Sequence, residues 1–255
     1  MNLDTIQQLL ELNQQFYQTF AEQFSATRGR LQPGVLRVLE TISAQAIILD
    51  LGCGNGELGR ELARRGHLGQ YLGLDFSSGL LDAALAGVQG SPNIAYAQAD
   101  LTATDWPSTL IRPPSTVPGE SAVSLQSSSF NFVFAFAALH HLPDDEVRRN
   151  LLRKIHTLLS PGGHFIHSNW QFLNSPRLKA RIQPWDTVGM DDADMDPGDY
   201  LLDWRRGGYG LRYVHHFSED ELRTLAAETG FQVLDWFYSD GQEGNLGLYQ
   251  IWKKI

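Results

Sequence analysis

Residues 46–56 read AIILDLGCGNG, and this stretch decides the fold. The apolar run at residues 46–51 predicts a buried strand, because short apolar runs bounded by turn residues are typical of parallel sheets. The glycines after it predict a tight turn, and a helix is predicted from about residue 56 to residue 65. In this order, the three features are typical of a nucleotide-binding site, because amides at a helix start favour an anionic group.

Strand-like and helix-like segments alternate on both sides of this stretch. Further strands are predicted at residues 71–74, 94–98, 132–136, 164–168, 232–238 and 246–252. Helices are predicted at residues 4–22, 35–42, 80–85, 145–159 and 218–229. This alternation predicts an α/β fold, in which a mostly parallel sheet carries helices on both faces.

Two segments interrupt the alternation. Residues 107–129 are rich in Pro and Ser and predict a surface insertion. Residues 171–211 are irregular, and we expect a substrate lid over the carboxyl ends of the strands, with a plain surface excursion as the alternative. The length of 255 residues and the 42% hydrophobic content predict a single domain at 1–255, with a helical cap at residues 1–45.

Composition restricts the compartment and the partners. The net charge of −9 repels nucleic acid at long range, so an RNA partner would need a local basic patch. The basic residues of the last third favour a solvated mixed surface over an RNA groove; they are Arg177, Lys179, Arg181, Arg205, Arg206 and Arg212. A single cysteine and a start without signal-peptide features predict a cytoplasmic protein, and no apolar run approaches the roughly 20 residues of a membrane span.

Three acidic residues stand at the ends of successive predicted strands. Asp50 precedes the glycines, Asp75 ends the second strand, and Asp100 follows the third. Asp75 is placed to accept hydrogen bonds from two ribose hydroxyls, as in NAD sites, and Asp100 from an adenine amino group. The spacing GxGxxG at residues 54–59 also fits a dinucleotide site, and each acid alone could be a helix cap or turn residue. Together, the three acids favour a nucleoside site.

The ordered motifs ILDLGCGNGELG, YLGLDFSSGLLDAA, IAYAQADL, FNFVFAFAALHHL and LLSPGGHFI resemble those of class I S-adenosylmethionine-dependent methyltransferases over residues 46–170. The resemblance implies a Rossmann-like, seven-stranded sheet in the order 3-2-1-4-5-7-6, with the last strand antiparallel. It implies glycines near the methionine moiety, Asp75 at the ribose and Asp100 at the adenine. The expected cofactor-binding residues are Tyr17, Arg28, Asp50, Gly52, Gly54, Gly56, Asp75, Phe76, Asp100, Leu101 and Phe136.

A methyl acceptor would meet residues after the fourth strand. His140 or His141 is a candidate base, although such a pair often only caps a helix or lines a pocket. Adjacent side chains point differently, which argues against joint metal ligation, and we expect no metal. The strand ends in AALH and not in the Asn/Asp-Pro-Pro-Tyr/Phe motif of amine-methylating nucleic-acid enzymes, which favours an oxygen acceptor. Cys53 is interpreted as a small filler within the turn, not as a nucleophile.

Three further stretches resemble the wobble-uridine tRNA carboxymethyl-methyltransferases. They are FYQTFAEQFSATR at residues 16–28, HH with RR at 140–149, and GD, W and RYVHHF between residues 198 and 217. This resemblance implies ester formation on the carboxylate of a carboxymethylated uridine in tRNA, and a small accessory protein as a partner. Gln23, Val214 and Leu246 stand where that family has His, Tyr and Trp.

The expected acceptor-side residues follow from the same resemblance. A carboxylate is ionised at pH 7, so it needs a cationic clamp more than a base. We expect Arg212 as this clamp, with Arg28 as the second candidate, and Tyr213 and His215 to orient the acceptor. Methylation of a small-molecule carboxylate or hydroxyl, and a non-catalytic cofactor-binding module, are the alternatives.

Overall fold

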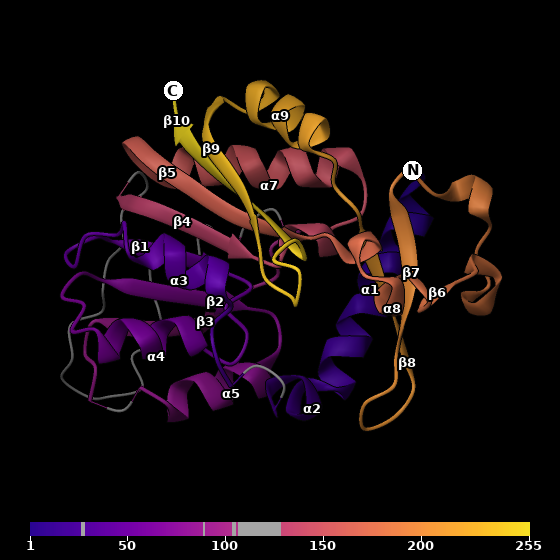
Figure 1. Ribbon diagram of the computed structural model, residues 1–255, viewed down its shortest axis with the longest axis horizontal. Helices are drawn as coiled ribbons and strands as arrows, with labels where there is room; N and C mark the ends of the chain where they lie inside the picture. Colours follow the sequence, from indigo (N-terminus) through magenta and orange to yellow (C-terminus); the bar gives the residue numbers. More distant parts are fainter. Residues whose placement is uncertain (27–28, 89, 104–105, 107–128) are drawn as a thin grey trace.

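A seven-stranded sheet in the order β3-β2-β1-β4-β5-β10-β9 forms the centre of the protein (Figure 1). The computed structural model describes residues 1–26, 29–88, 90–103, 106 and 129–255. The strands are β1 (Ile48–Leu51), β2 (Tyr71–Asp75), β3 (Ile94–Gln98), β4 (Phe130–Phe136), β5 (Leu159–Trp170), β9 (Phe231–Ser239) and β10 (Gly247–Lys254). The first five strands are parallel, and β10 is antiparallel to β5 and to β9. The predicted order is confirmed.

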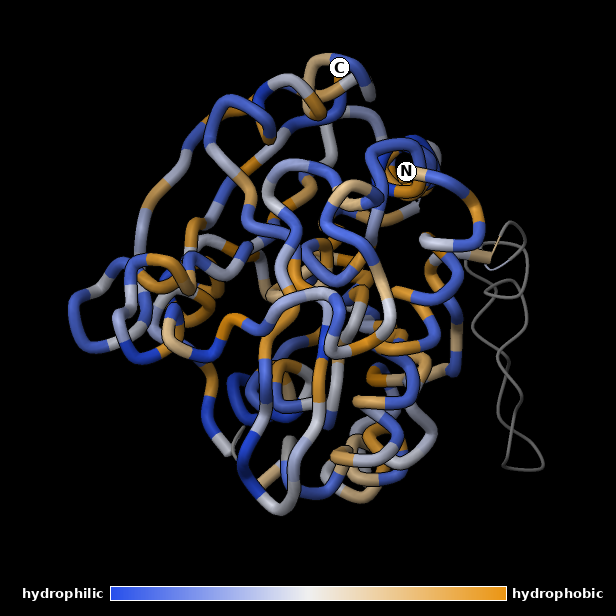
Figure 2. Tube along the Cα trace, turned by 90° about the vertical axis from the view of Figure 1, so that its right-hand side faces the viewer, coloured by the Kyte–Doolittle hydropathy of each residue, from blue (hydrophilic) through white to orange (hydrophobic). Residues whose placement is uncertain are grey.

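Helices cover both faces of this sheet, so its central strands are buried on both sides. On one face lie α3 (Pro33–Leu39), α4 (Glu57–Arg64) and α5 (Ser78–Ala86), whose apolar side chains form one core cluster with β1 and β2. On the other face lie α7 (Asp145–Leu158) and α9 (Glu219–Glu228), which form a second cluster with β4, β5 and β10. Figure 2 shows the hydrophobic residues gathered inside and the hydrophilic residues mainly on the outer turns.

The sequence of α7 explains where this helix begins and which face it buries. Asp144 caps its first turn, because its carboxylate accepts from the amides of Glu146 at 2.8 Å and Val147 at 3.4 Å. The buried apolar residues recur at helical spacing; they are Leu151, Leu152, Ile155 and Leu158.

The N-terminal region forms two helices where one was predicted at residues 4–22. α1 (Leu3–Thr19) has Phe20 as its C-cap, and α2 (Ala21–Ala26) follows it. The side chain of Asn2 accepts from the amide of Thr5 and begins α1. α1 lies beyond the carboxyl ends of the parallel strands, beside β8 (Gly210–His215) (Figure 1).

The interpretation of residues 171–211 as irregular is wrong. They contain α8 (Pro176–Lys179), short 3-10 turns at Phe172–Asn174, Trp185–Val188 and Asp192–Asp194, and two strands, β6 (Ile182–Gln183) and β7 (Asp199–Trp204). With β8 these strands form an antiparallel sheet in the order β6-β7-β8. The strand pattern was obscured because Asp199, Asp203 and Arg212 are buried polar residues in β7 and β8. That this segment moves as a lid stays a prediction.

The predicted insertion at residues 107–129 lies, apart from Ser129, outside the described residues. Among the helices that the structure describes, none is both long and apolar enough to cross a membrane.

Removal of a core side chain of α7 tests this packing. Leu152→Ala should lower the free energy of unfolding by about 2–5 kcal/mol, because Leu152 is fully buried between α7 and the sheet. Leu85→Ala on α5 is the matched control, because Leu85 is 52% exposed, and it should change that energy by less than about 0.5 kcal/mol. Urea unfolding measures both values, and equal losses would contradict this assignment of the core.

Candidate functional site

The turn after β1 forms the floor of a large cavity. Gly52 and Gly54 have φ angles of 73° and 56°, which a side chain would strain. The amides of Gly52 and Cys53 both donate to the carbonyl of Leu74 at the end of β2, at 2.8 and 2.9 Å. A Cβ added to Gly54 would meet no atom within 4 Å, so the turn leaves open space above it. These contacts hold the turn against β2 and leave its upper side for a ligand.

The cavity has a volume of about 950 Å³ and lies at the carboxyl ends of the parallel strands. Its walls include residues that follow β1, β2, β3, β4 and β5, residues of α1, and residues of β7 and β8. This size is sufficient for a nucleoside cofactor, because it lies near the upper end of the roughly 300–1,000 Å³ that ligand pockets typically span.

Asp75 joins two of these strand ends. Its carboxylate accepts from the amide of Gly54 at 2.9 Å and from the amide of Ser77 at 2.9 Å. Burial raises the pKa of Asp75, while the hydrogen bonds from Ser77 and Gly54 act in the opposite direction. Each carboxylate oxygen has a second lone pair, so Asp75 can accept further hydrogen bonds from a ligand in the cavity.

Asp50 lies beneath the turn and is buried, although it still lines the cavity. Burial raises its pKa to about 7, the hydrogen bond donated by Tyr71 at 2.6 Å lowers it, and the charge of Asp75 raises it. A carboxyl group that is costly to ionise in this cavity fits a cationic ligand, because a positive charge beside it would favour the carboxylate. S-adenosylmethionine carries such charges on its sulfonium and its ammonium groups.

The other predicted cofactor residues fall into three groups. Tyr17, Phe76, Asp100, Leu101 and Phe136 line the cavity, together with Asp50, Gly52, Gly54 and Asp75. Gly56 does not line it: a Cβ there would lie 2.6 Å from the hydroxyl of Tyr96, so this glycine serves packing beneath the turn. Arg28 lies outside the described residues.

The carboxylate of Asp100 is already used locally. One of its oxygens accepts from the amide of Thr102 at 2.9 Å and from the hydroxyl of Thr102 at 2.7 Å. Asp100 therefore shapes the turn after β3, and its other oxygen is the atom that an adenine amino group would need.

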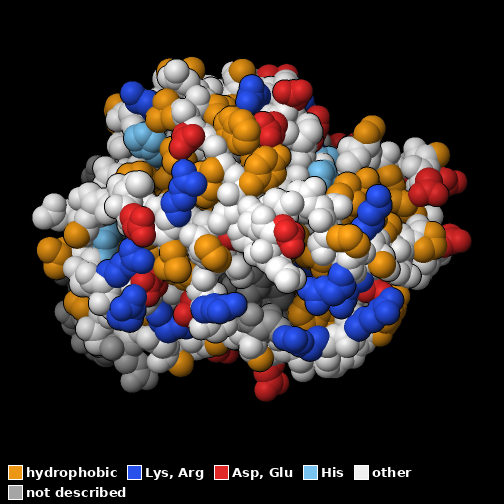
Figure 3. Space-filling model, in the orientation of Figure 1, with side chains coloured by type: hydrophobic (Ala, Val, Ile, Leu, Met, Phe, Trp, Pro, Cys, Tyr) orange, Lys and Arg blue, Asp and Glu red, His pale blue; other side chains and the backbone are white. Residues whose placement is uncertain are grey.

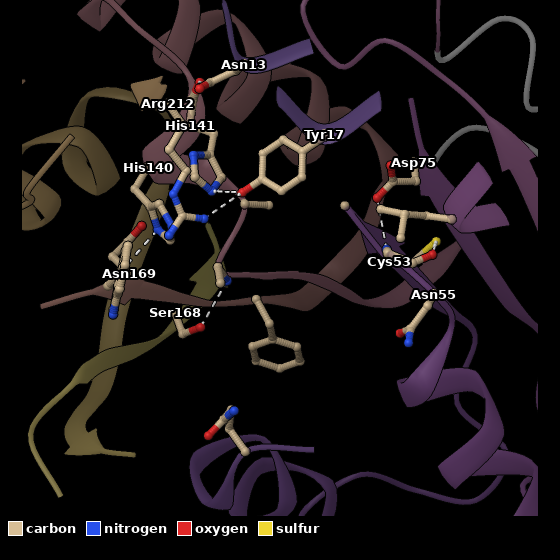
Figure 4. A pocket seen from close by; sticks show the side chains of 18 of the residues that line it. Asn13, Tyr17, Cys53, Asn55, Asp75, His140, His141, Ser168, Asn169 and Arg212 are labelled. Atoms are coloured by element: carbon tan, nitrogen blue, oxygen red, sulfur yellow. Dashed lines mark hydrogen bonds between the residues drawn. The ribbon is translucent and has the colours of Figure 1, made fainter. Parts of the chain in front are cut away.

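Tyr17, His141 and Arg212 meet on the opposite wall of the cavity (Figure 4). His141 Nδ1 lies 3.2 Å from the carbonyl oxygen of Tyr213, which can only accept, so Nδ1 carries a proton. In the neutral ring, Nε2 is then the acceptor for the Tyr17 hydroxyl at 2.6 Å. The same hydroxyl accepts from Arg212 Nη1 at 3.4 Å. The three side chains form a chain of hydrogen bonds from β8 through α1 to the end of β4.

Arg212 is the most unusual residue of this wall. It is only 6% exposed, and its Nε atom has no hydrogen-bond partner among the described residues. Its guanidinium carbon lies 4.9 Å from the ring centroid of Trp170, 5.3 Å from that of Phe16 and 5.8 Å from that of Trp204. The part of the chain that the structure describes offers it aromatic faces but no carboxylate.

His140 also lines the cavity and is buried. Its Nδ1 accepts from the amide of Trp170 at 3.3 Å, and its ring lies 4.4 Å from that of His141. The two histidines are therefore near each other, but they are oriented by different partners.

Tyr213 and His215, which we expected to orient the acceptor, do not line the cavity. Side chains alternate along a strand, so β8 directs Arg212 into the cavity and the side chains of Tyr213 and His215 to its other face. Both are buried there and contact Asp199. A role in direct contact with an acceptor does not fit this placement.

Sequence reasoning did not select Asn13, Trp170 or Trp204 as site residues. Asn13 lies on the buried face of α1 at four-residue spacing from Leu9 and Tyr17. Its side chain donates to the carbonyls of His141 at 3.1 Å and Tyr213 at 3.2 Å. A polar residue within an apolar helical stripe was a signal that could have identified it. Trp170 and Trp204 can be recognised as site residues only in the folded protein, where the guanidinium of Arg212 lies near both rings.

The fold and this site define the class of class I S-adenosylmethionine-dependent methyltransferases. Residues 21–235 match the family model described as a methyltransferase domain. The chain belongs to this family, it is an enzyme, and S-adenosylmethionine is its methyl donor.

Three curated proteins are similar in sequence. A protein of Encephalitozoon cuniculi, provisionally named a methyltransferase, is 27% identical over 86% of this chain and 87% of its own length. The trans-aconitate 2-methyltransferase of Deinococcus radiodurans is 34% identical over 46% of this chain and 35% of its own length. The tRNA (carboxymethyluridine(34)-5-O)-methyltransferase of Mus musculus is 26% identical over 66% of this chain and 22% of its own length. The chain therefore matches about a third or less of the last two proteins.

Solved structures share the fold. The methyltransferase in a complex with the Haloferax volcanii Trm112 methyltransferase activator has a TM-score of 0.62 at 15% identity, over 93% of this chain and 95% of that chain.

The pKa of Asp50 leads to a prediction about cofactor binding. At pH below about 7 the carboxyl group holds a proton that a cationic ligand must displace, so binding is weaker there. The Kd for S-adenosylmethionine should fall by about tenfold between pH 5.5 and pH 7.5, more steeply in the wild type than in Asp50→Asn. Calorimetry in two buffers of different ionisation enthalpy measures Kd and the number of protons released on binding. The Asp50→Asn variant shows how much of the pH dependence comes from titration of the ligand itself. Parallel pH profiles would contradict this role of Asp50.

Proposed function

We propose that this enzyme transfers the methyl group of S-adenosylmethionine to a carboxylate oxygen of its acceptor, and that Arg212 holds that carboxylate. The observation that carries the proposal is the buried guanidinium of Arg212, which has an unpaired Nε and no carboxylate partner among the described residues. A buried cation is costly unless an anion compensates it. A carboxylate ligand would supply two acceptor oxygens in the geometry that a guanidinium prefers.

The chemistry requires positioning more than proton transfer. When bound, the cofactor supplies an electrophilic methyl group on its sulfonium. A carboxylate with a pKa near 4 is already ionised at neutral pH, so it is the nucleophile without a general base. The task of Arg212 and the aromatic rings around it is to hold one oxygen in line with the methyl–sulfur bond and to exclude water.

We assign the cofactor to the side of the cavity formed by the strand ends. Asp75 is proposed to accept from the ribose hydroxyls, and Asp100 and Leu101 to contact the adenine. Gly52 and Gly54 then lie at the methionine moiety. The open space above Gly54 and the position of Asp75 beside it support this orientation. Phe76 and Phe136 line the cavity from the ends of β2 and β4, and Tyr17 links this side to Arg212.

The candidate acceptor is a carboxymethylated wobble uridine in tRNA. Carboxymethyluridine and trans-aconitate, which occur in the names of two relatives, both contain a carboxylate. Four arginines line the cavity on the side of the small sheet; they are Arg177, Arg181, Arg205 and Arg206. Asp203 pairs with Arg181 and Arg205, so Arg177 and Arg206 are the two that would favour a phosphodiester chain. Figure 3 shows Lys and Arg side chains around the hollow in this face. Tyr209, in the turn between β7 and β8, is 59% exposed and could stack on a base.

A small accessory protein remains part of this proposal. The structural similarity to a methyltransferase in complex with the Trm112 activator supports it.

One observation favours a hydroxyl acceptor as the second candidate. With the proton of neutral His141 on Nδ1, the Tyr17 hydroxyl donates to Nε2, so this pair could pass a proton from an acceptor hydroxyl to the imidazole. A small-molecule hydroxyl or carboxylate therefore remains the alternative substrate class.

Substitution of Arg212 tests the proposed clamp. Arg212→Gln should lower kcat/KM for tRNA that carries carboxymethyluridine by about two to three orders of magnitude, because it removes the buried partner of the carboxylate. The Kd for S-adenosylhomocysteine should change by less than about twofold, because the cofactor lies on the other side of the cavity. The kcat/KM of Arg212→Lys should lie between those of the wild type and Arg212→Gln, since lysine keeps the charge but not the planar guanidinium. Mass spectrometry of tRNA nucleosides measures the methyl ester.

Arg223→Gln is the matched control for this experiment, because Arg223 lies on α9 and its side chain is 51% exposed. It should have wild-type kinetics. Full methylation by Arg212→Gln would reject the carboxylate clamp.

Substitution of arginines that line the cavity beside the small sheet distinguishes a tRNA acceptor from a small-molecule acceptor. In the double variant Arg177→Gln/Arg206→Gln, tRNA should bind more weakly, and the slope of log K against log salt should fall by about 0.7 for each phosphate that is no longer neutralised. Arg64→Gln on α4 should leave the slope unchanged, because Arg64 lies outside the cavity and its side chain is 72% exposed. If the wild-type protein releases S-adenosylhomocysteine with a small carboxylate but does not bind tRNA, the tRNA proposal fails.

A further inference from the structure

A buried ionic network lies on the face of β8 opposite the cavity. It contains Arg148 of α7, Asp199 of β7, Tyr213 and His215 of β8, and Glu221 of α9. The side chains of Arg148, Asp199 and His215 are all 2% exposed or less, and that of Glu221 is 28% exposed. The network therefore connects two helices that cover the main sheet to two strands of the small sheet.

His215 lies between two carboxylates. Its Nδ1 is 2.6 Å from an oxygen of Asp199, and its Nε2 is 2.8 Å from an oxygen of Glu221. A neutral imidazole has only one N–H group, so one nitrogen would face a carboxylate with no proton between them. Only the imidazolium satisfies both contacts. Gly198 makes room for the ring: its φ is 97°, and an added Cβ would lie 2.9 Å from His215 Cε1.

Arg148 connects this pair to the segment that carries the two cavity histidines. Its Nε donates to the carbonyl of Leu142 at 3.0 Å, directly after His141. Its Nη2 donates to the hydroxyl of Tyr213 at 2.9 Å, and that hydroxyl donates to Asp199 at 2.7 Å. One guanidinium thus holds the end of the 3-10 turn at Leu139–His141, which follows β4, against β8.

The peptide groups next to Arg212 are held from the other side. The amide of Tyr213 donates to Asn13 Oδ1 at 2.9 Å. The carbonyl of Tyr213 accepts from Asn13 Nδ2 at 3.2 Å and from His141 Nδ1 at 3.2 Å. Both the main chain and the side chain of Tyr213, the residue after Arg212, therefore have hydrogen-bond partners.

We propose that Asp199, His215 and Glu221 are positioning residues that hold β8, and with it Arg212, against the segment carrying His141, and that His215 does so as an imidazolium. This proposal rests on the acceptor-binding role proposed above for Arg212. None of the three residues lines the cavity, so each acts on the acceptor only through the position of β8.

The charges around His215 determine how the network responds to pH. Asp199, Glu221 and Arg148 face it from β7, α9 and α7, and His216 is its neighbour on the chain. Burial lowers the pKa of His215, but the hydrogen bonds to Asp199 and Glu221 outweigh that effect and the pKa is raised. The network is therefore complete below the ordinary pKa of histidine, and it is lost as pH rises through the raised value.

Nitrogen NMR on the whole protein tests the proposal without an acceptor. In the wild type near pH 6.5, the ordinary pKa of histidine, both ring nitrogens of His215 should have imidazolium shifts, whereas an ordinary histidine is about half neutral there. Glu221→Gln should lower the ratio of imidazolium to imidazole at His215 by about tenfold, and it should speed hydrogen exchange at Arg212 Nε. Glu221 is partly exposed, so this variant should fold; Asp199→Asn should have the larger effect. Arg212→Lys assigns the Arg212 signal.

Asp220→Asn is the control, because it removes an exposed carboxylate of the same helix that lies outside the network. It should leave both signals unchanged. A neutral His215 in the wild type would overturn the proposal, and so would unchanged Arg212 exchange in both network variants. Failure of the Arg212 kinetic test with an intact NMR response would instead reject the acceptor role of Arg212.

Discussion

The rest of the site depends on the contact between the turn after β1 and the carboxylate at the end of β2. Asp75 accepts from the amides of Gly54 and Ser77, so one side chain connects two strand ends. Two further amides of the same turn donate to the carbonyl of Leu74. The turn can approach β2 this closely because its glycines adopt positive φ angles. The cavity floor is therefore defined by the main-chain amides of the turn, which donate to the Asp75 carboxylate and to the Leu74 carbonyl.

The two walls of the cavity have different origins. The floor belongs to the sheet that this family of enzymes shares, with helices on both faces. The opposite wall is formed by α1 and the small sheet β6-β7-β8, which place Tyr17 and Arg212 over the strand ends. Such a division is expected for enzymes that share a methyl donor but differ in acceptor, since the wall formed by α1 and the small sheet can change without the floor.

Charge is distributed unevenly across these walls. The protein carries a net charge of −9, and buried carboxylates lie beneath the cofactor side of the cavity. Arg212 and four further arginines line the cavity on the side of the small sheet, where Asp203 pairs with Arg181 and Arg205. The cationic methyl donor would meet the carboxylates, and the acceptor proposed above would meet Arg212.

The sequence by itself determined the strands of the central sheet and the glycine turn after β1, because these depend on local patterns. The order of the strands was implied by the resemblance to a known family, which the sheet confirms. Apolar runs that end in glycine or aspartate mark β1, β2 and the turns after them, whatever the rest of the chain does. The small sheet could not be recognised in this way, because Asp199 and Arg212 are buried within it, and only the fold brings them their partners His215 and Tyr17. Alternation along β8 also separated Arg212 from Tyr213 and His215, which are neighbours in the motif but lie on opposite faces of the strand. Only the tertiary structure decided which of these residues line the cavity, because the pairing of β7 with β8 and the packing of α1 set that orientation.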